Sequence, residues 1–266
     1  MGQRACCDGK MASSTEDVDV QPPSAGHGGA RGSSTGHTYE NGASYTGQWS
    51  GTARSGRGVM SWPDGARYDG EWEGDRANGQ GRFEHADGDV YEGQWCNDKA
   101  HGTGIYCHGN GTRYEGEWRD DRRHGHGMET WPDGAQYTGQ YRHGQKEGRG
   151  HFLWSDESSY EGGFQASGLH GEGTYCWEDG RRFEGQWQDN KMHGFGTFRW
   201  TDGRLYVGQY ENDQKSGEGK FTWPDGRTYE GQWQKGKQHG TGSFTSSKGE
   251  TVSGVWEAGK RVVTNS

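Results

Sequence analysis

The amino-acid sequence predicts an all-β protein, in which an elongated single-layer antiparallel meander of tandem 23-residue β-hairpins follows a disordered N-terminal tail. The first observation behind this prediction is a repeat, because Tyr45-Thr-Gly-Gln-Trp49 returns in similar form every 23 residues. The second is the alternation of aromatic or glycine residues with polar residues in each copy, which is typical of a half-buried strand. The third is composition: 52 glycines and 13% aromatic residues accompany only three leucines, so a core must be built from rings.

We count repeat positions from the tyrosine, so that Tyr45 occupies position 0 and Trp49 occupies position 4. Position 2 is glycine and position 4 is aromatic in all ten copies, and positions 11 and 13 are glycine in all nine complete copies. This agreement indicates one structural unit used again and again. The ten copies start at residues 45, 68, 91, 114, 137, 160, 183, 206, 229 and 252.

Each copy is predicted to hold two short strands, at positions 0–4 and 13–17, which gives about twenty strands in the array. Because the glycine at position 2 lacks a side chain, we expect neighbouring rings to lie flat against the sheet there. Segments such as Trp62-Pro-Asp-Gly65 should form tight hairpin turns, since glycine accepts a positive φ. The other connection, positions 5–12, should be longer.

Two places depart from the pattern. The turn glycine is absent from Ser155–Ser159, and Gly163-Phe164 replaces the usual Gln-Trp, so we expect a local irregularity in this region. The last copy begins with Val252 in place of tyrosine, and it should cap the array. The array is predicted to span residues 39–259, with residues 260–266 as a C-terminal tail.

Residues 1–38 carry no repeat and are rich in glycine and serine, which predicts a disordered tether. Gly2 follows the first methionine as an acceptor for myristoylation would, and Cys6 and Cys7 are candidates for palmitoylation. Two acyl chains hold a protein firmly at a membrane, whereas one holds it only marginally. Two alternatives remain open: the Met-Gly start is accidental, or Met11 is the true start.

The order Tyr-x-Gly-x-Trp, His-Gly-x-Gly, Asp-Gly at 23-residue spacing resembles the MORN (membrane occupation and recognition nexus) repeat family over about residues 39–259. The resemblance implies a twisted single-layer sheet with an aromatic-lined groove. It also implies a scaffold of cytoskeletal, ciliary or membrane-contact settings, which dimerises or grips an extended or helical segment of a partner. Choline-binding repeats are also aromatic and rich in glycine, but their period is shorter.

The aromatic stripe is the candidate partner-binding site, because exposed aromatic area of this extent usually marks an interaction surface. The alternative is that the same rings are simply the packing face. The residues chosen for the groove come from positions 0 and 4: Tyr68, Trp72, Tyr91, Trp95, Tyr114, Trp118, Trp187, Tyr229 and Trp233.

Other chemistry is not expected, and we predict neither an enzyme nor a cofactor. Histidines recur at position 10, but neighbouring repeats are roughly 9–10 Å apart, too far for one metal ion, so loop histidines are the preferred interpretation. Glutamates such as Glu115 and Glu117 should be solvated rather than catalytic. The recurring histidines are His101, His124, His170, His193 and His239.

The net charge of −9 disfavours nucleic acid as a partner and weakens the alternative of a phospholipid-binding module, since no polybasic cluster compensates. No signal-peptide core is present, and five cysteines without framework spacing favour a reducing compartment. We therefore expect a cytoplasmic protein that is not secreted and is peripheral at a membrane inner face, the cytoskeleton or a cilium.

Overall fold

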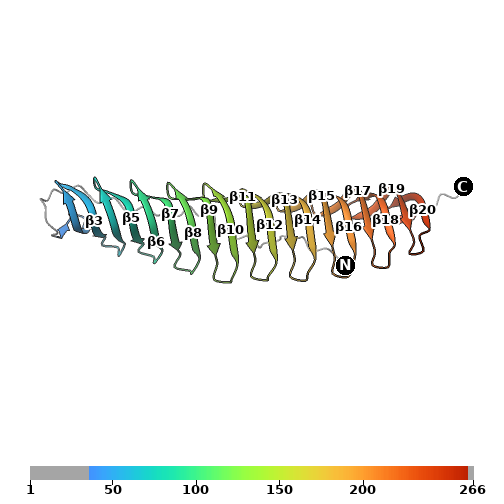
Figure 1. The fold of residues 1–266 in the computed structure, drawn as a ribbon, viewed down its shortest axis with the longest axis horizontal. Coiled ribbons are helices and arrows are strands. Elements are labelled where there is room, and N and C mark those ends of the chain that lie inside the picture. Colours follow the sequence, from blue (N-terminus) through green and yellow to red (C-terminus); the bar gives the residue numbers. More distant parts are fainter. Residues whose placement is uncertain (1–35, 263–266) are drawn as a thin grey trace. The chain divides into compact units, whose positions relative to one another are not determined.

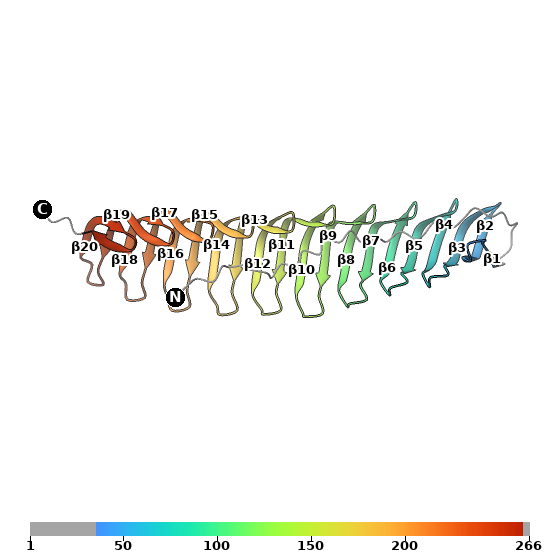
Figure 2. The same cartoon turned by 180° about the vertical axis from the view of Figure 1, so that it is seen from behind.

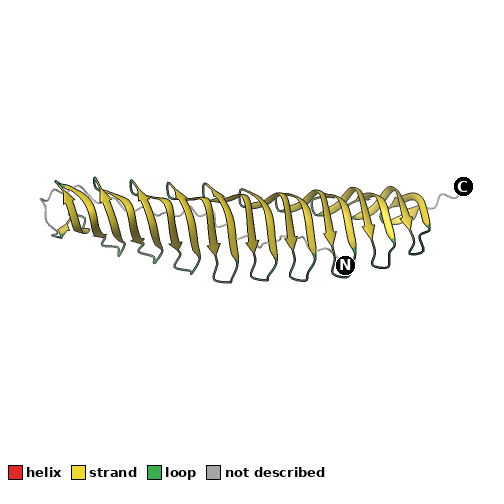
Figure 3. Ribbon diagram, in the orientation of Figure 1, coloured by secondary structure: helices red, strands yellow, loops and turns green. Residues whose placement is uncertain are grey.

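The computed structural model describes residues 36–262, which contain β-strands and turns (Figure 3). Within that range no helix is present that is long and apolar enough to cross a membrane. The strands belong to a single antiparallel sheet, which confirms the predicted fold class.

The chain divides into two compact units, and the boundary falls between Lys146 and Glu147. We describe each unit separately as the N-terminal unit and the C-terminal unit. The strands that begin in the N-terminal unit are β1 (His37–Thr38), β2 (Ser44–Ser50), β3 (Ala53–Ser61), β4 (Arg67–Glu73), β5 (Arg76–Glu84), β6 (Val90–Cys96), β7 (Lys99–Cys107), β8 (Arg113–Arg119), β9 (Arg122–Thr130), β10 (Gln136–Arg142) and β11 (Gln145–Leu153). The C-terminal unit continues with β12 (Ser159–Gln165), β13 (Gly168–Cys176), β14 (Arg182–Gln188), β15 (Lys191–Arg199), β16 (Leu205–Glu211), β17 (Gln214–Thr222), β18 (Thr228–Gln234), β19 (Lys237–Thr245), β20 (Thr251–Glu257) and β21 (Lys260–Val262).

Within each unit, consecutive strands pair antiparallel as a meander (Figures 1 and 2). From β2 to β19, even-numbered strands have seven residues and hold positions −1 to 5, whereas odd-numbered strands have nine and hold positions 8 to 16. Each repeat is therefore one hairpin, as predicted, but its second strand begins at position 8 rather than at position 13.

The two kinds of connection are the reverse of the prediction. The tight turn lies at positions 6 and 7, for example Asn97 and Asp98, whose φ angles are 51° and 67°. Two positive φ values define a turn whose twist matches that of the flanking strands. The Trp62–Ala66 connection is longer, and the Gly65 N–H donates to the Trp62 carbonyl at 3.1 Å. The prediction missed this turn because Asn-Gly is the usual signal of a two-residue hairpin turn, whereas many other residues occupy positions 6 and 7.

The glycine at position 11 is a bulge inside a strand, not a loop residue. Gly102 has a φ of 65°, and the register between β6 and β7 shifts between Gly93 and Trp95. Gln94 Oε1 accepts the N–H of Thr103 at 2.8 Å, and a Cβ on Gly102 would lie 2.0 Å from the same oxygen. The glycine is thus required both for its backbone conformation and for the space that the glutamine occupies.

The tyrosine at position 0 lies over the glycine at position 2, as expected, and also over the glycine at position 13. A Cβ on Gly70 would be 2.5 Å from the Tyr68 hydroxyl, and a Cβ on Gly81 would be 2.3 Å from it. The hydroxyl donates to the Glu71 carbonyl at 3.0 Å. Each tyrosine therefore fills the space that positions 2 and 13 leave empty, with its polar end satisfied.

The aromatic residue at position 4 joins one repeat to the repeat before it. The Trp72 ring centroid lies 5.0 Å from Tyr68 and 5.5 Å from Tyr45, with edge-to-face geometry in both cases. The Trp72 indole N–H donates to the carbonyl of Gly58 at 3.0 Å. Repeat proteins build their core from such contacts between neighbouring repeats, and they have no single central core.

The ends of the array extend beyond the predicted limits. His37 and Thr38 form β1 and pair with β2, so the predicted tether overlaps an ordered strand. Lys260–Val262 pairs with β20, so strand structure continues past residue 259. Both corrections have the same cause: an end strand can pair through its backbone without carrying the repeat's side-chain pattern.

The irregularity expected near residue 155 is absent from the C-terminal unit. Glu157 takes the place of the turn glycine with a φ of 65°, and its N–H still donates to the Trp154 carbonyl at 3.0 Å. Phe164 is buried where tryptophan usually lies. Its register with β13 shows the same shift after Gly162 as the equivalent hairpins show.

Candidate partner-binding surface

The nine residues predicted to line a partner-binding groove are all buried in the core. Trp233 is the most exposed of them, and its exposed fraction is only 7%. The reason is the packing described above, because each tyrosine lies over glycines and each tryptophan lies between two aromatic rings of position 0. These rings present no open face, so the packing interpretation holds for them and the groove assignment was wrong. They are Tyr68, Trp72, Tyr91, Trp95, Tyr114, Trp118, Trp187, Tyr229 and Trp233.

A second set of rings, at positions 15 and 17, forms a continuous ladder in the C-terminal unit. The Phe198 centroid lies 5.1 Å from Trp177 and 4.3 Å from Trp200. Phe221 repeats the arrangement at 5.6 Å from Trp200 and 4.7 Å from Trp223. The phenylalanines are buried, but the three tryptophans are only half-buried. Within this ladder, the aromatic surface that remains accessible is therefore found at position 17.

Each of these tryptophans carries an arginine from position 21. The Arg204 guanidinium carbon lies 5.2 Å from the centroid of the Trp200 ring, and Arg204 Nε is 2.7 Å from Asp202. Stacking of this kind is a cation–π contact, which the aspartate helps to hold in place. We call this surface the Trp–Arg row, and it consists of Trp177, Trp200, Trp223, Arg181, Arg204 and Arg227.

The Trp–Arg row was not predicted, although a signal for it exists. The segment Trp-x-Asp-Gly-Arg occurs at Trp177–Arg181, Trp200–Arg204 and Trp223–Arg227, in three consecutive repeats. The arginine in this pattern separates these repeats from the N-terminal ones, where alanine, aspartate or threonine follows the turn glycine.

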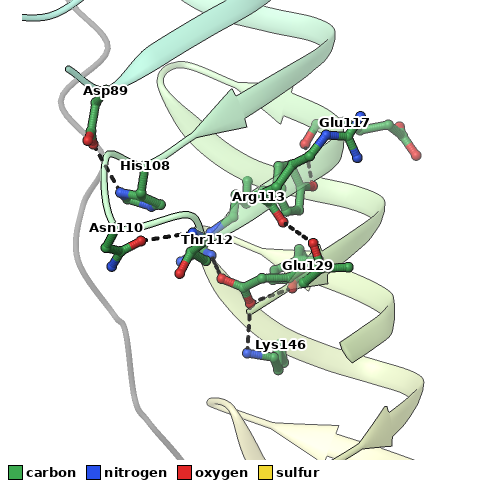
Figure 4. A network of polar contacts seen from close by, with 12 residues as sticks. Asp89, His108, Asn110, Thr112, Arg113, Glu117, Glu129 and Lys146 are labelled. Atoms are coloured by element: carbon green, nitrogen blue, oxygen red, sulfur yellow. Dashed lines mark hydrogen bonds and ion pairs between the residues drawn. The ribbon is translucent and has the colours of Figure 1, made fainter. Parts of the chain in front are cut away.

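Cations also enter the aromatic core, at position 9. In the N-terminal unit, Glu129 lies between Arg123 and Lys146, and it accepts hydrogen bonds from Lys146 and Tyr141 at 3.0 Å each. Figure 4 shows Glu129 and Lys146 within the surrounding polar contacts. Burial alone would raise the pKa of Glu129, but the charges of Lys146 and Arg123 and the hydrogen bonds hold this pKa below its ordinary value. The carboxylate is ionised and fully satisfied.

Arg54 uses a different carboxylate. Its guanidinium lies 4.4 Å from the centroid of the Trp72 ring, and Arg54 Nε is 3.1 Å from Asp75 Oδ1. The same aspartate accepts the Arg54 N–H at 2.9 Å. Asp75 belongs to the two-residue turn of the next repeat, so position 7 is a second place from which the chain neutralises a cation at position 9.

Lys215 occupies position 9 in the C-terminal unit without such a carboxylate. Its ammonium nitrogen lies 4.5 Å from the centroid of Phe221, 4.8 Å from Trp233 and 5.2 Å from Trp200. Among the described residues, this nitrogen has no hydrogen bond or ion pair. Burial lowers the pKa of Lys215 from 10.5 to about 8, and the charge of Arg204 contributes to the shift. The side chain is half-buried, beside the Trp–Arg row.

Asp89 forms a satisfied polar cluster in the N-terminal unit (Figure 4). Its carboxylate accepts hydrogen bonds from Tyr106 at 2.7 Å and from the Gly109 N–H at 2.8 Å, and it is 3.0 Å from His108 Nδ1. Burial opposes ionisation, but these partners lower the pKa of Asp89. The cluster fixes a turn.

The remaining candidates have structural roles in the described residues. Glu117 accepts the His126 N–H at 2.7 Å across the bulge, so it is more than a solvated carboxylate, whereas Glu115 is exposed and pairs with Arg113. The histidines at position 10 lie in strands, which corrects the loop assignment, and no group of three His, Cys, Asp or Glu side chains within residues 36–262 could hold a metal ion. Gly2, Cys6 and Cys7 lie outside the described residues.

The repeat geometry agrees with a comparison against protein families. The model of the MORN repeat matches nine consecutive segments that run from residues 45–67 to residues 229–251. The chain belongs to the MORN repeat family. The tenth predicted copy, which starts at Val252, is not among the matched segments, and in the structure it supplies β20 and β21.

Solved structures provide only loose likenesses. The TCP10 domain of Danio rerio CPAP in complex with a peptide of STIL has a TM-score of 0.40 and 13% identity, over 82% of this chain and 96% of that one. The Drosophila melanogaster SAS-4 TCP domain, in complex with a proline-rich motif of Ana2, has a TM-score of 0.36 and 14% identity, over 59% and 85% of the two chains. Scores this low establish neither a shared site nor a shared partner. No curated protein matches the sequence significantly.

Proposed function

We propose that this MORN protein is a non-enzymatic scaffold that docks an extended segment of a partner protein along the Trp–Arg row. The observation that supports this most is the row itself, where three half-buried tryptophans in consecutive repeats each carry an arginine. Tryptophan and arginine are the residue types most enriched at binding hot spots. Three equivalent Trp-x-Asp-Gly-Arg segments provide a regular surface for one continuous segment of the partner.

The spacing of the modules favours a polyproline-II segment. Strands of a sheet lie about 4.7–4.9 Å apart, so equivalent side chains of consecutive repeats are roughly 9.4–9.8 Å apart. A polyproline-II helix advances about 9.3 Å in a three-residue turn, so one face would meet each tryptophan in succession. A β-strand returns to the same face after about 6.6–6.8 Å, which does not match.

A photo-crosslinking amino acid at position 204 would identify the partner segment in cells that express the protein. The synthetic segment should bind the full chain saturably and bind Trp200→Ala at least about tenfold more weakly. Glu184→Ala, an exposed change at position 1 of the same repeat, should leave its affinity unchanged. Equal affinity for the two variants would rule out docking along the row, once circular dichroism has shown that both are folded.

The N-terminal segment is proposed to tether this scaffold to a cytoplasmic membrane face through Gly2 and the cysteine pair. In cell fractionation, the C-terminally tagged chain should sediment with membranes, whereas Gly2→Ala and the double change Cys6→Ser/Cys7→Ser should turn soluble. Identical behaviour of all three would remove the acyl tether from the proposal and leave partner docking as the means of localisation.

A further inference from the structure

Cations at position 9 are paired within the chain in three of four half-buried or buried cases in the described residues. Arg54 pairs with Asp75, and Arg123 and Lys146 share Glu129. Lys215 is the fourth case, and it has aromatic rings around it but no carboxylate. A half-buried ammonium without an anion is costly, because the rings replace only part of its lost hydration.

In the other cases the carboxylate comes from one of two positions in the repeat, and neither of these positions holds a carboxylate near Lys215. Lys146 and Lys215 are equivalent side chains three repeats apart, so the counterpart of Glu129 is Phe198. The counterpart of Asp75 is Gly236, whose N–H donates to the Lys215 carbonyl at 2.9 Å. Part of the surroundings is the same in the two repeats, although Phe164 is the counterpart of Trp233 and Ala135 that of Arg204. Trp131, Tyr137 and Tyr141 correspond to Trp200, Tyr206 and Tyr210.

We propose that Lys215 is the binding site for a carboxylate of the partner, supplied by a glutamate or aspartate of the segment that docks on the Trp–Arg row. The proposal rests on the proposed function for the source of the carboxylate. The partner's acidic group takes the part that Glu129 plays in the N-terminal unit. Trp200 belongs both to the row and to the surroundings of Lys215, so a segment that crosses this tryptophan brings its side chain to the ammonium. A carboxylate is the class of anion that the chain itself uses for this position.

Two peptides test this, acetyl-(Pro-Pro-Glu)4-amide and acetyl-(Pro-Pro-Gln)4-amide, with binding to the full chain measured by calorimetry. The wild type should bind the glutamate peptide about tenfold more tightly than the glutamine peptide. Lys215→Met and Phe198→Glu should both reduce this preference to less than about twofold, and in Lys215→Met the affinity for the glutamine peptide should stay the same. Phe198→Glu is the sharper variant, because it supplies the internal carboxylate that the equivalent repeat already has.

Lys220→Met is the matched control, since Lys220 lies in the same strand, is exposed and pairs with Glu230. It removes the same charge and should retain the full preference for glutamate. An unchanged preference in Lys215→Met and Phe198→Glu overturns the proposal. Loss of binding to phosphatidylserine vesicles in Lys215→Met, with the peptide preference unchanged, would also overturn it and would assign the site to lipid head groups.

A direct measurement separates this proposal from the docking proposal. In a chain labelled with ¹⁵N-lysine, sodium acetate should perturb the Lys215 signal saturably, whereas sodium chloride at equal ionic strength should not. Phe198→Glu should abolish the effect. If neither peptide binds but acetate perturbs Lys215, the carboxylate site stands and docking of a polyproline-II segment fails. If acetate has no effect and the glutamate peptide is not preferred, the carboxylate site fails.

Discussion

Gly81 has no side chain because the Tyr68 ring occupies the place where one would be. A Cβ on Gly81 would lie 2.3 Å from the tyrosine oxygen and 2.6 Å from Cζ, and Gly81 does not have a positive φ. The restriction is therefore steric rather than conformational. The Tyr68 hydroxyl is hydrogen-bonded and the ring packs against a tryptophan on each side, so the tyrosine cannot easily move aside.

Gly81→Ala should lower the free energy of unfolding by about 3 kcal/mol through overpacking. Gly74→Ala, where φ is 55° and the space is open, should cost only about 1 kcal/mol from backbone strain. Urea unfolding of both variants, and of Gly81→Ala combined with Tyr68→Ala, would measure the coupling. Additive effects in the double variant would show that the tyrosine is not the cause.

Glu157 adopts a positive φ of 65° at a place where equivalent turns have glycine. A non-glycine residue pays about 1–2 kcal/mol for this conformation. Glu157→Gly should therefore raise the free energy of unfolding by about 1 kcal/mol, with the turn unchanged. Gly134→Ala is the mirror control and should lower it by a similar amount, since φ there is 91° and the space is open. A destabilised Glu157→Gly would show that the side chain contributes more than its backbone costs.

At the scale of single elements, the alternation of residues predicted that each repeat has two strands but not where the second strand begins. Glycine at position 11 suggested a loop, since the sequence alone does not distinguish a bulge from a turn. Nor does the alternation tell which ring is accessible. Trp187 and Trp200 both fit the pattern, but Trp187 lies between two aromatic side chains, Phe183 and Tyr160, whereas Trp200 follows the end of a strand and remains half-buried.

The hairpin of β16 and β17 should become more stable as the pH rises, because of Lys215. Its pKa is lowered from 10.5 to about 8 by burial, so between these values the unfolded chain binds more protons than the folded one. Stability then increases with pH across this window, by up to about 2–3 kcal/mol. The difference in free energy of unfolding between wild type and Lys215→Met, measured from pH 7 to 10, should change in favour of the wild type. A difference that stays constant over this range would contradict a lowered pKa.

At the scale of the whole molecule, the sequence predicted the repeat, its length and its meander because these depend on contacts between neighbours alone. The partner-binding surface could not be predicted in the same way. It depends on which rings remain accessible in each repeat, and the rings at positions 0 and 4 recur with the same period as those at positions 15 and 17. The tethering segment remains a prediction, since Gly2, Cys6 and Cys7 lie outside the described residues.

Deletion of residues 183–205 removes one whole repeat and joins Arg182 to Tyr206 in the correct phase. Because interactions are between neighbours, the shortened chain should fold with one cooperative transition at a lower midpoint. Deletion of residues 183–194 breaks the phase and should abolish folding of the C-terminal unit. Circular dichroism and tryptophan emission would distinguish the two. Equal damage by both deletions would show that repeats are not interchangeable.

The hydrogen bond from Trp72 to the carbonyl of Gly58 has a consequence for the order in which a newly made chain can fold. Its donor lies 14 residues after its acceptor, and the same direction recurs in Trp95, Trp187 and Trp233. Such a repeat can therefore complete its packing only after the tryptophan of the following repeat has been synthesised. At about 5–20 residues per second, the delay is about 1–3 s for every repeat. Where position 4 is tryptophan, we therefore expect the growing end of the chain to expose one incomplete layer of tyrosine and glycine until that tryptophan has been synthesised.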